Sequence, residues 1–203
     1  MLGRTEQSQG VAGEAQLSAV SIADRDARLE VEAKALIVLS RTGDANGVKK
    51  GLEALGTKIA DVDNPAERVS LAALLEATAA AVGNTVAAQK YAAEIDAYAE
   101  KITDVPQRIK ALATAAARLY RGERPAEGRK RLDAAVVLAR GLTDPAAKAD
   151  ALLVIFETLQ DLRKTVPLAE LLPEAKLAAA AVADEKARTA LTARVQTLLT
   201  LPE

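Results

Sequence analysis

A helix-capping residue recurs every 40 positions along this chain, and this recurrence restricts the fold more strongly than any other feature. It stands at Asp24, Asn64, Asp104, Asp144 and Asp184. Because the side-chain oxygen of Asp or Asn accepts hydrogen bonds from the free amides of a helix's first turn, each residue marks a helix start. A fixed period of this length indicates identical units that stack side by side.

Each 40-residue interval holds apolar residues at helical spacing on both sides of a central break. Leu71, Leu74 and Leu75 belong to a first helix of roughly 18 residues, and Ile95 and Ile102 to a second of roughly 15. The breaks fall at 43–44, 83–84, 122–123 and 161–164, mostly at glycine. The sequence therefore predicts a single repeat domain over 23–203, preceded by a flexible leader over 1–22 that contains a short helix covering the first repeat. The predicted hairpins are 23–62, 63–102, 103–142 and 143–182, with a capping helix over 183–203.

The core is expected to be aliphatic and closely packed. Alanine accounts for 46 of the 203 residues, whereas there are one Phe, three Tyr and no Trp. Alanine favours helix and adds little bulk, so the helices must approach one another closely to exclude water. No segment shows the alternating pattern of a strand, and we predict an all-α fold.

The turn and second helix of the first unit resemble those of a tetratricopeptide repeat. The stretch 43–55, Gly-Asp-Ala-Asn-Gly-Val-Lys-Lys-Gly-Leu-Glu-Ala-Leu, carries Gly47 where that family places a small residue between touching helices. The period here is 40 residues, whereas it is 34 in the family. The resemblance implies a right-handed α-solenoid of antiparallel hairpins with about 9 to 10 helices. It also implies a concave face on which a protein or peptide docks.

Charge and residue types exclude several classes of function. Lys and Arg number 27 against 28 Asp and Glu, so no overall field attracts nucleic acid. No apolar stretch approaches the roughly 20 residues needed to span a membrane. The absence of Cys and His removes the commonest catalytic groups and zinc ligands, and we predict no enzyme, no cofactor and no metal site. Residues 42–53 nearly match the ligand spacing of a calcium loop, but Thr42 replaces its first Asp and the repeat already explains them as a turn.

Three groups of residues are candidate contacts with a partner. The first is the set of aromatic and apolar side chains Tyr91, Ile95, Tyr98 and Tyr120, which anchor a ligand if their face is concave and fill the core otherwise. The second is an irregular apolar corner in the fourth repeat, where Pro167 and Pro173 are expected to kink or restart the second helix. The corner is a binding site or a distorted end repeat, and consists of Phe156, Leu159, Val166, Leu168, Leu171 and Leu172.

The third group is basic. A patch at the turn of the third repeat comprises Arg118, Arg121, Arg124, Arg129, Lys130 and Arg131, and is either a site for an acidic partner or a solvated turn. A separate ladder of cations follows each cap by four residues, at Arg28, Arg68, Arg108, Lys148 and Arg188. We expect each ladder cation to pair with its own cap residue, although aligned cations also suit an acidic segment.

Two functional hypotheses follow from the repeat pattern. The first is a non-enzymatic adaptor that holds a protein or peptide on its concave face. The alternative is a periplasmic carrier that binds a lipid, sterol or hopanoid in an aliphatic groove or cavity. The N-terminal residues show no signal-peptide pattern, so the compartment is the cytoplasm or, after removal of an export signal, the periplasm. We favour the periplasm.

Overall fold

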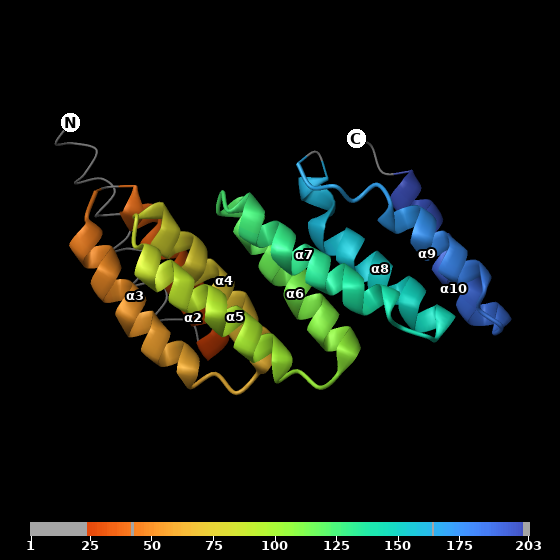
Figure 1. The fold of residues 1–203 in the computed structure, drawn as a ribbon, viewed down its shortest axis with the longest axis horizontal. Helices are drawn as coiled ribbons and strands as arrows, with labels where there is room; N and C mark the ends of the chain where they lie inside the picture. Colours follow the sequence, from red (N-terminus) through yellow and green to blue (C-terminus); the bar gives the residue numbers. More distant parts are fainter. Residues whose placement is uncertain (1–23, 42, 164, 201–203) are drawn as a thin grey trace.

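A computed structural model describes residues 24–41, 43–163 and 165–200. Those residues form nine α-helices and one short 3-10 helix, with no strand among them, and the helices stand in an elongated row (Figure 1). This confirms the prediction of an all-α, solenoid-like fold. The helices are α2 (Arg25–Ser40), α3 (Ala45–Ala60), α4 (Pro65–Ala81), α5 (Thr85–Glu100), α6 (Val105–Arg121), α7 (Pro125–Arg140), α8 (Pro145–Leu159), η1 (Gln160–Leu162), α9 (Leu171–Ala180) and α10 (Glu185–Leu199).

The helices form two layers. In the first layer α2, α4, α6, α8 and α10 each pack against the next, and in the second layer α3, α5, α7 and α9 each pack against two helices of the first. Each second-layer helix contacts both its hairpin partner and the first helix of the following hairpin. The interior helices of the first layer are therefore covered from several sides. In α4 every residue from Leu71 to Ala79 is buried.

Side-chain caps start the first-layer helices at the expected positions. The side-chain oxygens of Asp24, Asn64, Asp104, Asp144 and Asp184 each accept a hydrogen bond from a backbone N–H of the first turn. Asp44 and Asn84 cap α3 and α5 in the same way. The five predicted helix starts are confirmed, and each supplies about 1 kcal/mol to the stability of its helix.

Three of the five ladder cations reach backward to the end of the preceding hairpin. Arg68 donates to the carbonyl oxygens of Ala60, the last residue of α3, and of Val62, two residues beyond it. Lys148 likewise donates to the carbonyl of Arg140 over 3.0 Å, and Arg188 donates to the carbonyl of Val182 over 3.3 Å. A cation is favourable at the negative end of a helix, so these three cations tie consecutive hairpins together. We expected each cation to pair with its own cap residue, and the sequence did not predict these hydrogen bonds to backbone carbonyls.

The fourth hairpin departs from its neighbours at Pro167 and Pro173, and of the two expected outcomes, a kink or a restart, it shows the restart. Instead of a long kinked helix, α8 passes through η1 into a loop, and α9 begins only at Leu171 and has 10 residues. Pro173 lies in the first turn of α9, where a helix N–H has no intrahelical acceptor to lose. The proline therefore shortens the helix without kinking it.

Close approach of α4 and α6 generates the first testable prediction. A Cβ added at Gly122 would overlap the Cβ of Ala77, whereas one added at Gly141 would meet only backbone oxygens at an ordinary 3.5 Å. Both glycines end a helix at negative φ. We expect Gly122→Ala to lower the free energy of unfolding by about 1–3 kcal/mol through overpacking. Urea denaturation measures this free energy, and the control variant Gly141→Ala should stay close to the wild type. If the two substitutions lower the free energy of unfolding equally, the overlap with Ala77 is refuted.

Candidate functional site

A groove on the first layer is the main candidate site. Its cavity volume is about 780 Å³, and it crosses α2, α4, α6 and α8. The lining residues are Glu30, Lys34, Ile37, Ser40, Arg41, Leu74, Ala77, Ala81, Thr114, Ala117, Arg118, Arg121, Gly122, Glu123 and Thr158. We call this set the groove. Four helices from four successive hairpins contribute to it, so the stacking of the repeats creates it.

Equivalent positions of successive repeats line the groove. They lie 10, 13 and 17 residues after each cap, a spacing that places them on one face of a helix. At the middle of the three positions stand Ile37, Ala77 and Ala117, which give the groove an apolar floor. The other two sets are Lys34, Leu74 and Thr114, and Arg41, Ala81 and Arg121.

An ion pair spans the groove from α6 to α2. Arg118 Nη2 lies 3.1 Å from a carboxylate oxygen of Glu30, and Lys34 lies 2.8 Å from the other. Burial alone would raise the pKa of Glu30, but the hydrogen bonds and charges of Lys34 and Arg118 outweigh it and lower that pKa. Glu30 is thus held ionised. Only 17% of the Arg118 side chain is exposed, so this pair is partly shielded from water.

The groove carries an excess of positive charge. Its charged side chains are four cations, Lys34, Arg41, Arg118 and Arg121, and two carboxylates, Glu30 and Glu123. Arg121 also pairs with Asp161 over 2.7 Å, but both side chains are about half exposed. Such an exposed pair contributes little and is easily exchanged for another carboxylate.

The predicted aromatic anchors lie away from the groove. Tyr91 is buried between α5 and α3, where its hydroxyl donates over 2.8 Å to the carbonyl of Leu52. Burial, with smaller effects of Glu94 and Glu53, raises its pKa to about 12. Ile95 is fully buried. Tyr98 and Tyr120 are half-buried against the core cluster that contains Ile95, whereas Tyr91 belongs to the other cluster. None of these four side chains lines the groove.

The structure divides the predicted basic patch among three environments. Arg118 and Arg121 line the groove. Arg129 pairs with Asp133 on the exposed surface of α7, and Lys130 with Asp96 over 3.1 Å. The remaining two, Arg124 and Arg131, belong to the junction between the second and third hairpins. Two of the six predicted residues therefore meet in the candidate site.

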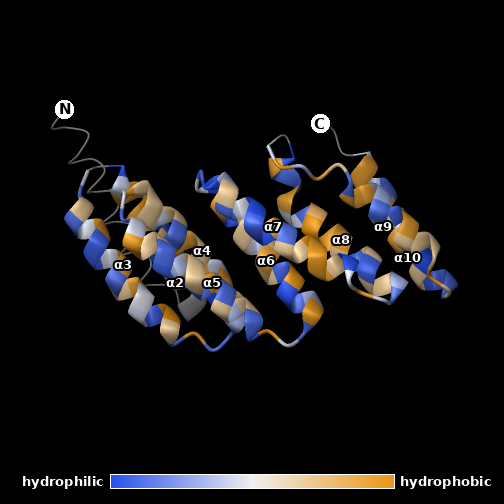
Figure 2. Ribbon diagram, viewed as in Figure 1, coloured by the Kyte–Doolittle hydropathy of each residue, from blue (hydrophilic) through white to orange (hydrophobic). Residues whose placement is uncertain are grey.

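The apolar corner of the fourth hairpin is filled by its own side chains. Phe156 is 6% exposed, and the other five members are buried too. All six belong to one continuous hydrophobic core: Phe156, Leu159, Val166, Leu168, Leu171 and Leu172. Figure 2 shows this concentration of hydrophobic residues around α8 and the start of α9.

A buried ionic cluster occupies the junction between the second and third hairpins. Glu76 of α4 and Arg131 of α7 are each only 1% exposed. Arg124 Nη2 lies 3.8 Å from Glu76, while Arg131 contacts Asp96 over 3.0 Å and donates to the carbonyl of Ala92. Burial raises the pKa of Glu76, because it outweighs the opposing effects of Arg131 and Arg124.

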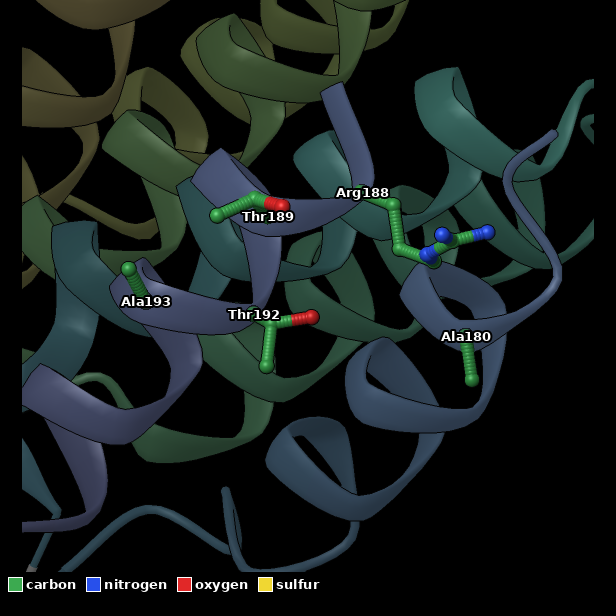
Figure 3. Close-up of a pocket in the computed structure, with 5 residues that line it drawn as sticks. All are labelled: Ala180, Arg188, Thr189, Thr192 and Ala193. Carbon is green, nitrogen blue, oxygen red and sulfur yellow. The ribbon is translucent and has the colours of Figure 1, made fainter. Parts of the chain in front are cut away.

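A second hollow lies where α9 ends beside α10 (Figure 3). Its volume is about 590 Å³, and it is lined by Ala180, Arg188, Thr189, Thr192 and Ala193. Figure 3 shows Thr189, Thr192 and Ala193 on α10, with the Arg188 side chain extending toward α9. The sequence predicts a ladder cation at Arg188 and a capping helix in this region, but it does not predict the hollow.

The described residues hold neither a cluster of metal-binding side chains nor a membrane-spanning helix. Across the described ranges, no three acidic side chains are grouped so that they could hold a metal ion. Asp44, from the calcium-like stretch, accepts from the N–H of Gly47 over 2.8 Å as a helix cap. No helix in the part of the chain that the structure describes has the length and apolar character needed to cross a membrane.

Comparison with known proteins supports the fold. No protein-family model matches the chain, and no curated protein matches it in sequence. The crystal structure of Ton1535 from Thermococcus onnurineus NA1 is similar over 96% of this chain, with a TM-score of 0.66 and 15% sequence identity. The chain spans 57% of the length of that protein. The similarity therefore extends to the arrangement of helices, and it shows the fold alone.

The buried Glu76 predicts a pH-dependent stability. Because its pKa is higher in the folded chain than in the unfolded chain, its ionised form costs stability at neutral pH, and this cost falls as the pH drops through the folded pKa. We expect Glu76→Gln, which stays neutral, to unfold at higher urea than the wild type at neutral pH. The advantage should disappear below pH 4.5, the ordinary pKa.

Glu100→Gln, on the exposed surface of α5, serves as the control for this measurement. It should follow the wild-type pH profile. An advantage of Glu76→Gln that stays constant with pH would show that Glu76 is not the titrating group.

Proposed function

We propose that the protein is a non-enzymatic adaptor that binds an acidic peptide segment of a partner protein in the groove. The observation that carries the proposal is the groove itself, which equivalent positions of successive hairpins line with an apolar floor and a surplus of two cations. The assignment from fold to function is an analogy, and the site supplies the chemistry.

The shape of the groove favours an extended chain. Because it crosses four first-layer helices, a ligand that follows it meets side chains of four hairpins in turn. Ile37, Ala77 and Ala117 along the floor accept small apolar side chains. Arg41 and Arg121, both exposed, are placed to receive carboxylates at the edge of α6 and α2.

Electrostatics at the groove suit exchange of partners. Arg118 is already paired with Glu30 in a partly shielded position, whereas Arg121 holds its own partner weakly in solvent. An acidic ligand displaces Asp161 from Arg121 at little cost and gains a bidentate contact. The charge of the groove thus selects acidic segments, and the floor limits the size of the apolar side chains between them.

Binding is tested with a displayed library of random short peptides. We expect the selected peptides to be rich in Asp and Glu and to bind Arg121→Glu about tenfold or more weakly than the wild type, a change of about 1.4 kcal/mol. Arg129→Glu is a matched control, because Arg129 and Arg121 are 52% and 50% exposed and each lies 2.7 Å from an Asp oxygen. Equal loss in both variants would indicate nonspecific charge attraction and contradict the groove.

The carrier hypothesis predicts a different result in the same preparation. Native mass spectrometry of the purified protein would then show a co-purifying lipid. The packed corner around Phe156 leaves the groove as the place for such a ligand. Detection of a bound lipid that Arg121→Glu does not affect, with no peptide selected, would replace the adaptor proposal.

A further inference from the structure

The last first-layer helix, α10, has one face without a second-layer neighbour among the described residues. In the four hairpins before it, each first-layer helix packs against the helix that follows it: α2 against α3, α4 against α5, α6 against α7 and α8 against α9. The corresponding face of α10 lines the hollow of Figure 3 instead. Thr189, Thr192 and Ala193 are exposed there.

The positions that line the hollow are the seat of a second-layer helix. One period earlier the equivalents of Thr189, Thr192 and Ala193 are Ala149, Leu152 and Leu153, all of which are fully buried. Two periods earlier they are Ile109, Leu112 and Ala113, which are at most 5% exposed. The hollow thus marks the place where the repeat pattern calls for one more helix.

Two of the residues that line the seat, Thr189 and Ala193, can be buried without leaving a side-chain donor unpaired. The hydroxyl of Thr189 donates over 2.8 Å to the carbonyl of Glu185 within α10, so its methyl group remains for packing. Ala193 adds no polar side-chain atom. Leu199 is 50% exposed, although its equivalents Leu119 and Leu159 are fully buried. These residues form a small, mostly apolar surface suited to a helix with small side chains.

The sequence before Asp24 has the phase and side chains of a second-layer helix. Four periods of 40 residues before the buried residues of α9, and before Val182 just beyond it, stand Val11, Ala12, Ala15, Ala19 and Ile22. Their equivalents Leu171, Leu172, Ala175, Ala179 and Val182 are all buried. Residues 1–23 lie outside the described ranges, so this match rests on the sequence.

We propose that residues 11–22 of a second copy of this chain occupy the hollow on α10, so that copies join head to tail. The segment cannot reach its own α10, because it leads directly into α2, and α2 and α10 stand at opposite ends of the row (Figure 1). The two ends are complementary: α10 has no following second-layer helix among the described residues, and residues 11–22 have the sequence pattern of such a helix. Such a joint unites different surfaces of the two copies, and successive joints extend the array or close a ring.

The charge of the chain permits this contact. The formal net charge is only −1, so copies repel one another weakly. At the other end of the row Val38 of α2 is 37% exposed, whereas its equivalent Thr78 is fully buried. A joint that places α10 next to α2 covers Val38 in the same way.

Sedimentation over a range of concentrations tests the proposal on the full chain. We expect the wild type to form dimers and larger species as concentration rises, and Ala193→Lys to shift half-association to at least tenfold higher concentration. Ala97→Lys, at an exposed site on the outer side of α5, should associate like the wild type. A wild type that stays monomeric up to about 1 mM, or a control that loses association equally, overturns the proposal.

Cross-linking identifies the occupant and remains informative if a lysine variant folds poorly. The chain has no Cys, so Ala193→Cys in one copy and Ala15→Cys in a size-tagged second copy form the only possible disulfide between unlike copies. We expect the mixed dimer to form readily under mild oxidation, and the mixture with Ala97→Cys in place of Ala193→Cys to give much less. Equal yields from both mixtures would refute residues 11–22 as the occupant.

Discussion

Mutual coverage of helices is the constraint on which the rest of the structure depends. A hairpin in this chain is too poor in large side chains to bury its apolar stripe alone, so every first-layer helix relies on the hairpins beside it. The run from Leu71 to Ala79 shows the result, because successive residues on every side of α4 are buried. Covering a helix all round requires neighbours that approach closely, and alanine permits that approach. Between α4 and α6 the approach is so close that Gly122 has no room for a Cβ beside Ala77.

The same constraint determines where the protein can bind anything. A side chain is available only where no neighbouring helix covers it, which happens along the open side of the first layer, on the outer side of the second layer and at the ends of the row. The groove lies on the open side of the first layer, and the hollow on α10 lies at one end of the row. The interior offers the buried ionic cluster of Glu76 and Arg131 instead, where burial raises the pKa of Glu76 against the opposing charges of Arg131 and Arg124.

Sequence reasoning predicts the repeat well because capping chemistry is local. Asp104 caps α6 through the N–H of Gln107 whatever the neighbours do. The late start of α9 was harder, since Pro173 is compatible both with a kink inside a helix and with a first turn. Positions 34, 74 and 114 carry a periodic signal for the groove, but the sequence does not tell which side of the first helix stays uncovered. Tyr91 shows the limit of prediction from spacing, because its position in the sequence fits a ligand site and a core equally. Only the structure, in which its hydroxyl donates to the carbonyl of Leu52, distinguishes the two.

Head-to-tail joining would couple the two surfaces. If α10 of one copy stands beside α2 of the next, the first layer continues without a break, and the groove recurs at a fixed spacing along it. An acidic partner with several binding segments then engages several copies at once, which raises its effective affinity without any new contact in a single groove. The weak, exposed pairing of Arg121 with Asp161 fits that arrangement, since many modest contacts hold a partner firmly and still allow exchange.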